Sequence, residues 1–175
     1  MIKYFTVIVF LFYNCTFAQE ANHAIAANSI KANFSVKVLE AYEENSFSKL
    51  EDFYELLEIY SAKNTPNTLK KQLEERINAL YKENTLVSDF FTSDKISVDR
   101  LLEKVASKEL KFEVKNIQKV KTFGNYWTAS YILTIQRDKE TLQKNISQRI
   151  YFYPEAKTFG NKKKEVWSLF LGEME

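Results

Sequence analysis

The stretch Tyr126-Trp-Thr-Ala-Ser-Tyr-Ile-Leu-Thr-Ile135 decides the fold of this chain. Its apolar side chains fall at every second position, which predicts a strand with one buried face. The apolar positions are Trp127, Ala129, Tyr131, Leu133 and Ile135. Residues 110–120, 146–152 and 166–172 show a similar alternation. The second half of the chain is therefore predicted to form about four strands.

Two copies of one pentapeptide separate these predicted strands. Lys121-Thr-Phe-Gly-Asn125 recurs as Lys157-Thr-Phe-Gly-Asn161. Because Gly-Asn supplies the positive φ that hairpin turns require, each copy predicts a turn between antiparallel strands. In the first strand the apolar positions change phase near Lys115-Asn116, which predicts a β-bulge or a sharp bend. Together these signals predict a curved antiparallel sheet.

The residues before this sheet follow a helical period instead. Ser48 and Glu51 have the form of a capping box after a pause at residues 44–46, so a helix is predicted to begin there. Its buried stripe consists of Leu50, Phe53, Tyr54, Leu57 and Tyr60. Thr65-Pro66 predicts the start of a second helix that runs to about Asn84. Its apolar face is Leu69, Leu73, Ile77, Leu80 and Tyr81.

A third helix is predicted to begin at Ser97, where a new apolar period starts. Its buried face would be Val98, Leu101, Leu102 and Val105. Residues 86–91 fit either a short strand or a packed loop. The predicted fold class is therefore α+β, with N-terminal helices packed on a curved antiparallel sheet of about four strands.

The first eighteen residues have the three parts of a secretory signal peptide. Lys3 gives a positive start, residues 4–13 are apolar, and Thr16-Phe-Ala18 is a small-x-small cleavage site. The apolar run is well short of the ~20 residues that span a bilayer as a helix, so no integral membrane segment is expected after cleavage. We predict an exported protein, periplasmic or secreted. The alternative is a lipoprotein anchored through Cys15.

Cleavage would divide the chain into a signal peptide (1–18), a lead-in with the first helical residues (19–45) and a single α+β domain (46–175). The only cysteine, Cys15, would be lost with the signal, which excludes disulfides and cysteine metal sites in the mature chain. The full chain has a formal net charge of +2. Because this leaves no strong field, no nucleic-acid partner is expected.

Four stretches carry a resemblance to a known group: Phe112-Glu-Val-Lys-Asn-Ile117, Tyr126 to Ile135 as quoted above, Arg149-Ile-Tyr-Phe152 and Val166-Trp-Ser-Leu-Phe-Leu-Gly172. They resemble the last four strands of nuclear transport factor 2-like (cystatin-like α+β) domains, in which a tryptophan often opens the final strand. The resemblance covers roughly residues 46–175. It implies that a long helix packs into the concave side of the sheet. The signal peptide and a composition rich in Lys, Asn, Ile, Phe and Tyr would make the chain an exported bacterial member. Some enzymes of that group use an aspartate with a tyrosine or a second acid in this concave space.

Few residues are candidates for chemistry. The only histidine, His23, lies in the polar lead-in, and glycine-rich phosphate loops are absent, so neither a metal nor a cofactor is expected. Asp89 is the candidate catalytic acid, because its neighbours Phe90 and Phe91 would desolvate it and raise its pKa. A loop or capping role for Asp89 is the simpler interpretation.

Aromatic residues on the predicted strands are the candidates for a ligand pocket. They are Trp127, Tyr131, Tyr151, Tyr153 and Trp167. The alternative interpretation of these residues is plain core packing. We expect a noncatalytic exported domain that binds a small apolar ligand or a protein partner, with homodimerisation through its sheet as a further expectation. The alternatives are an isomerase- or hydrolase-type enzyme with a buried Asp-Tyr pair, and a periplasmic lipid carrier.

Overall fold

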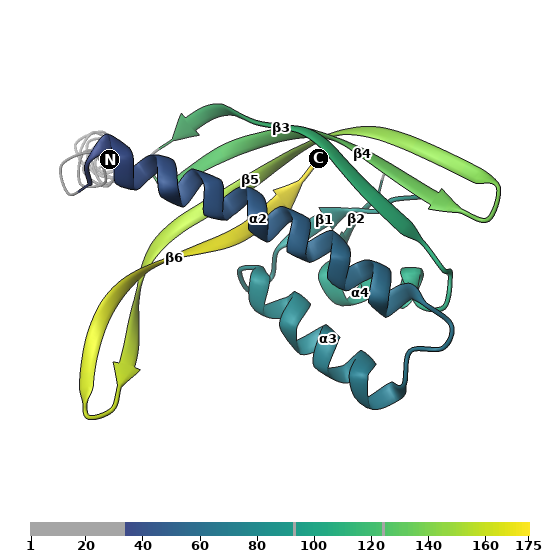
Figure 1. Ribbon diagram of the computed structural model, residues 1–175, viewed down its shortest axis with the longest axis horizontal. Coiled ribbons are helices and arrows are strands. Elements are labelled where there is room, and N and C mark those ends of the chain that lie inside the picture. Colours follow the sequence, from purple (N-terminus) through teal and green to yellow (C-terminus); the bar gives the residue numbers. More distant parts are fainter. Residues whose placement is uncertain (1–33, 93, 124) are drawn as a thin grey trace, which may run out of the picture.

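A computed structural model describes residues 34–92, 94–123 and 125–175, so the expected signal peptide, Cys15 and His23 lie outside the described residues. Three helices and two short strands come first: α2 (Val36–Ser61), α3 (Asn67–Leu80), β1 (Leu86–Ser88), β2 (Lys95–Ser97) and α4 (Val98–Val105). Four long strands follow: β3 (Lys111–Phe123), β4 (Tyr126–Arg137), β5 (Glu140–Phe159) and β6 (Lys162–Met174). The predicted α+β class is confirmed (Figure 1).

The long strands form an antiparallel meander in the order β3-β4-β5-β6. Both copies of the pentapeptide lie at hairpin turns, closed by the pairs Phe123–Tyr126 and Phe159–Lys162. Gly160 has φ +60°, the conformation for which a glycine was expected there. Along β4, every second residue from Trp127 to Ile135 is buried, as the alternation predicted.

The phase change in β3 is a β-bulge. The register between β3 and β4 shifts between Lys115 and Gln118, and Asn116 at this point has φ +57°. Asn is one of the few residues other than glycine that adopts this conformation readily. A second shift follows between Lys119 and Lys121. Bulges bend a strand, and β3 curves over α2 in Figure 1.

The predicted pause at residues 44–46 is wrong, because α2 is one continuous helix of 26 residues. Its N-cap is Ser35, whose side chain accepts from the amide of Val38. Ser46 Oγ donates to the carbonyl of Glu43 (2.6 Å) and Ser48 Oγ to that of Glu44 (3.3 Å). These serines therefore bond back to the preceding turn, a use of hydroxyls inside a helix that the capping-box pattern does not distinguish from a cap.

The other two helices agree with the predicted pattern more closely. α3 begins one residue after Pro66 and ends at Leu80, before the predicted limit of Asn84. It ends early because Tyr81 forms a parallel bridge with Leu171 of β6. Leu69, predicted on the buried face, is 38% exposed. α4 is confirmed, with Ser97 as its N-cap and the four predicted residues buried.

Residues 86–91 prove to contain a short strand followed by a loop. β1 pairs with β2 in a two-stranded antiparallel ribbon beside the main sheet. The helix α2 runs along the concave side of the main sheet, and α3 and α4 lie on the other side of α2 (Figure 1). The core between these layers includes Leu50, Phe53 and Leu57, each 0% exposed.

Candidate functional site

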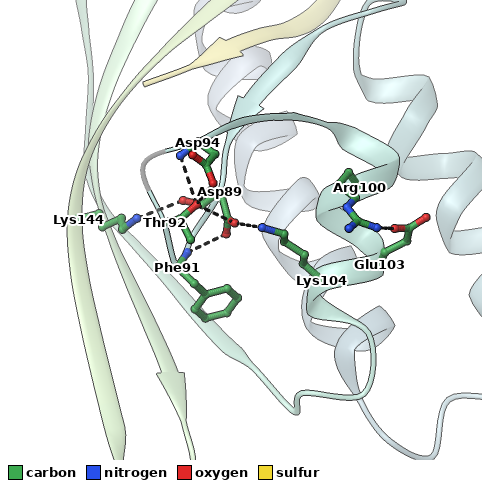
Figure 2. Close-up of polar contacts among 8 residues, drawn as sticks. All are labelled: Asp89, Phe91, Thr92, Asp94, Arg100, Glu103, Lys104 and Lys144. Carbon is green, nitrogen blue, oxygen red and sulfur yellow. Dashed lines mark hydrogen bonds and ion pairs between the residues drawn. The ribbon is translucent and has the colours of Figure 1, made fainter.

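Asp89, the predicted acid, is buried in the loop between β1 and β2 (Figure 2). Its carboxylate accepts hydrogen bonds from the Phe91 amide (2.9 Å) and the Thr92 hydroxyl (3.0 Å), and it forms an ion pair with Lys104 of α4. The Lys144 ammonium donates to the Asp89 backbone carbonyl (3.2 Å). One residue thus ties the loop to α4 and to β5.

The electrostatic environment of Asp89 is opposite to the one expected. Burial by itself raises the pKa of the carboxyl, as predicted from its aromatic neighbours. The hydrogen bonds from Lys104, Phe91 and Thr92 outweigh burial and hold the pKa below its ordinary value. The expectation of a raised pKa is therefore wrong, because sequence alone did not place Lys104 beside the acid. At neutral pH Asp89 is ionised and holds the β1–β2 loop through its hydrogen bonds and its ion pair with Lys104.

Tyr131 lies at the centre of a second, fully buried polar network. Its hydroxyl lies 2.9 Å from that of Tyr54 and donates to Gln148 Oε1 (2.7 Å). Gln148 Nε2 donates in turn to the Tyr81 hydroxyl (3.4 Å) and to the Gly172 carbonyl (3.3 Å). Burial raises the pKa of Tyr54, Tyr81 and Tyr131, so these phenols stay protonated at any physiological pH.

Asp89 and Tyr131 belong to separate networks. No hydrogen bond joins Asp89 to a tyrosine in the part of the chain that the structure describes. The nearest link is Phe90, whose ring packs 6.3 Å from that of Tyr54, centroid to centroid. Within the described residues, every buried side-chain nitrogen or oxygen has a hydrogen-bond partner. The buried polar side chains around Tyr131 are hydrogen-bonded to one another.

The five predicted aromatic residues do not line one pocket. Trp127 is buried and its indole N–H donates to Ser46 Oγ (3.3 Å), so it belongs with Tyr131 in the interior. Tyr151 and Tyr153 stack on each other on the outer face of β5, with ring centroids 5.6 Å apart. Only Trp167 borders an open groove.

Trp167 also closes an aromatic cluster at the start of α2. Its ring contacts Phe152 at 4.6 Å and Phe34 at 5.3 Å between centroids. Tyr42 packs against Phe152 at 4.5 Å. These contacts pack the start of α2 against the sheet.

The groove lies between α2 and the outer edge of β6 and has a volume of about 610 Å³. Its lining comes from α2, the end of α3, β5 and β6, and consists of Tyr42, Asn45, Ser48, Lys49, Asp52, Ala79, Glu155, Lys157, Trp167, Ser168, Leu169 and Phe170. Sequence reasoning missed the members on α2. These α2 residues recur every three or four positions, which is the spacing of one helix face. The predicted pause at residues 44–46 divided them between two separate helical segments, so the common face was not recognised.

The groove borders the free edge of the sheet. β6 is an outer strand of the sheet. Among the described residues, the edge that faces away from β5 has one backbone hydrogen bond, in which the Leu171 carbonyl accepts from the Lys82 amide (3.4 Å). Because backbone direction alternates along a strand, Leu169 and Trp167 point their N–H and C=O groups to the same side as Leu171. Among the described residues, no backbone group is hydrogen-bonded to the N–H or C=O of Trp167 or Leu169 on this edge.

Lys49 is the cation that faces this groove from α2. Burial lowers the pKa of its ammonium, Asp52 and Glu155 raise it, and Lys157 lowers it further. Lys49 forms no ion pair with the described residues, whereas Lys157 pairs with Glu155 at 3.4 Å. The groove therefore combines aromatic rings, a free strand edge, two lysines and two carboxylates.

No protein-family model and no curated protein matches this chain. Among the described residues, no helix combines the length and apolar character needed to cross a bilayer. The same residues contain no group of three or more His, Cys, Asp or Glu side chains placed to hold a metal ion.

Proposed function

We propose that this protein is an exported, noncatalytic domain that binds an extended segment of a protein partner in the groove between α2 and β6. The observation that carries the proposal is the free backbone edge of β6 inside the groove. Unpaired N–H and C=O groups on an edge strand are a template for an added strand. The bridge between Tyr81 and Leu171 is already one such pairing, made by the chain itself.

The shape of the groove favours an extended segment over a small apolar ligand. Pockets for small molecules are enclosed and lined mainly by apolar side chains. This groove is open, and four of its lining residues are charged: Lys49, Asp52, Glu155 and Lys157. A strand laid along β6 would pair with Trp167 and Leu169 through its backbone and place alternate side chains toward α2.

Selection of displayed random peptides of about twelve residues against the purified domain tests the proposal. Dissociation constants of enriched peptides would be measured by fluorescence anisotropy. Ala79→Arg places a long side chain in the groove from an exposed position, so it should abolish binding. Gln72→Arg adds the same side chain to an exposed position of α3 that does not line the groove, and it should leave binding unchanged. Peptide binding should also slow hydrogen exchange at the amides of Trp167 and Leu169.

Three results would contradict the proposal. Enriched peptides that bind Ala79→Arg as well as the wild type would place their site elsewhere. A selection that enriches no peptide would remove the binding function. If light scattering shows that the wild-type domain is a dimer and that the Ala79→Arg variant is a monomer, the free edge of β6 binds a second copy of this chain.

Export is a separate part of the proposal, supported by the sequence of residues 1–18. The intact mass of protein recovered from its natural host tests it. Cleavage after Ala18 predicts a mature chain that begins at Gln19. A lipid-modified Cys15 would instead show a membrane-anchored form, and an uncut chain in the cytoplasm would contradict export.

A further inference from the structure

The long β5–β6 ribbon extends away from the helices to its turn (Figure 1). Its inner end lines the groove. Lys157, which lines the groove, pairs across the ribbon with Lys164, and Phe159 pairs with Lys162. Because side chains alternate along each strand, these four residues share one face of the ribbon. Phe159 is 55% exposed on this face.

The positive charges on this face are only partly compensated, because Glu155 lies beside Lys157 and Asp52 lies near Lys49. Lys157 and Lys164 lie directly opposite each other, an arrangement that destabilises a two-stranded ribbon. Lys162 and Lys164 form no ion pair with described residues, and Lys157 has only the contact with Glu155. With Lys49 at the inner end, the cations follow the path from the groove to the turn.

We infer that the extended segment bound in the groove is acidic, and that its carboxylates run along Lys49, Lys157, Lys164 and Lys162; this rests on the proposed function. A strand paired with β6 directs every second side chain to one side. Acidic residues at that period would meet this row of ammonium groups. Desolvation of Lys49 strengthens the attraction, because Coulomb energies increase as the local dielectric falls.

Three synthetic peptides of about twelve residues provide the test. Each alternates valine with one other residue, which is glutamate, glutamine or lysine. The Val-Glu peptide should bind at least about tenfold more tightly than Val-Gln, and Val-Lys should bind most weakly. The preference should shrink at high salt, because most of these charges are exposed.

Single lysine substitutions test which ammonium groups cause the preference for the Val-Glu peptide. Lys49→Gln and Lys164→Gln should each weaken binding of the Val-Glu peptide by roughly threefold to tenfold, and Lys49→Arg should restore it. Lys163→Gln is the control, because Lys163 pairs with Thr158 on the opposite face of the same ribbon. It should change the affinity by less than about twofold.

The outcomes separate this inference from the proposed function. If Val-Gln binds as well as Val-Glu and both are blocked by Ala79→Arg, the groove binds peptides without acidic preference and only this inference fails. If Lys163→Gln weakens binding as much as Lys164→Gln, the ordered row is contradicted. If no peptide binds, both fail. If phosphatidylglycerol vesicles bind through these lysines and peptides do not, the basic face belongs to a membrane surface and the inference is overturned.

Discussion

Replacing Asp89 with asparagine should remove the charge that anchors the β1–β2 loop while leaving the shape of the side chain. The amide oxygen of the asparagine can still accept from Phe91, but the ion pair with Lys104 is lost. Hydrogen bonds to charged groups contribute about 1.5–3 kcal/mol, and breaking a fully buried ion pair costs about 3–5 kcal/mol. The Lys104 side chain is 31% exposed and can turn to solvent, so the lower range applies. We expect Asp89→Asn to destabilise the fold by about 2 kcal/mol.

Urea unfolding measures this loss at neutral and at acid pH. Because the folded-state pKa of Asp89 lies below its ordinary value, the ionised carboxylate stabilises the fold at every pH above that value. This stabilisation disappears as the pH falls through the depressed pKa. The deficit of Asp89→Asn should therefore be full at pH 7 and should shrink below about pH 3.8.

A double-mutant cycle with Lys104→Met assigns the effect to the pair. The coupling free energy should reach about 1 kcal/mol or more at neutral pH. Asp94→Asn is a control, because Asp94 is exposed and its carboxylate accepts from the Thr92 hydroxyl, whereas Lys104 pairs with Asp89. A coupling near zero, or a deficit that does not depend on pH, would refute this account of the loop.

Three further substitutions probe other parts of the fold. Gly172→Ala should lower stability and displace the Tyr151 ring, since a Cβ at Gly172 would lie 2.4 Å from Tyr151 Cε2; an unchanged melting temperature would contradict the packing. Asn116→Val should cost roughly 1–3 kcal/mol in urea unfolding while Asn116→Gly costs little, because the bulge requires φ +57°; equal effects would contradict a strain origin. Tyr131→Phe should cost about 1–3 kcal/mol by calorimetry, because it leaves Gln148 Oε1 without its donor; a neutral result would show that the interior network rearranges.

The sheet could be predicted from the sequence because its signals are local. The alternation in β4, the repeated turn pentapeptide and the bulge at Asn116 each depend on neighbouring residues. The continuity of α2 could not be predicted in this way. Asn45 and Ser46 resemble a helix end locally, yet the helix continues through them, and its first half contacts Phe152, a residue far along the chain, through Tyr42.

Still less of the candidate site could be predicted from local sequence signals. The burial of Asp89 followed from its aromatic neighbours, but its pKa is set by Lys104, which only the tertiary fold brings near. Tyr151 was recognised as an aromatic strand residue, yet its face of the sheet depends on register and not on residue type. To predict the groove from the sequence, one would have to know that α2 is unbroken and that β6 is an edge strand. The likeness to nuclear transport factor 2-like domains stays a prediction.

The contacts of Met174 have a consequence for the rate of folding. Its carbonyl accepts from the Ser88 hydroxyl across 86 positions, and its sulfur accepts from the Tyr54 hydroxyl across 120. The meander, by contrast, is built from hairpins that close over short turns. Since closing a long loop costs more entropy than closing a short one, the hairpins can form early and independently. The slow step should then be the joining of the sheet to the helices, governed by the last strand.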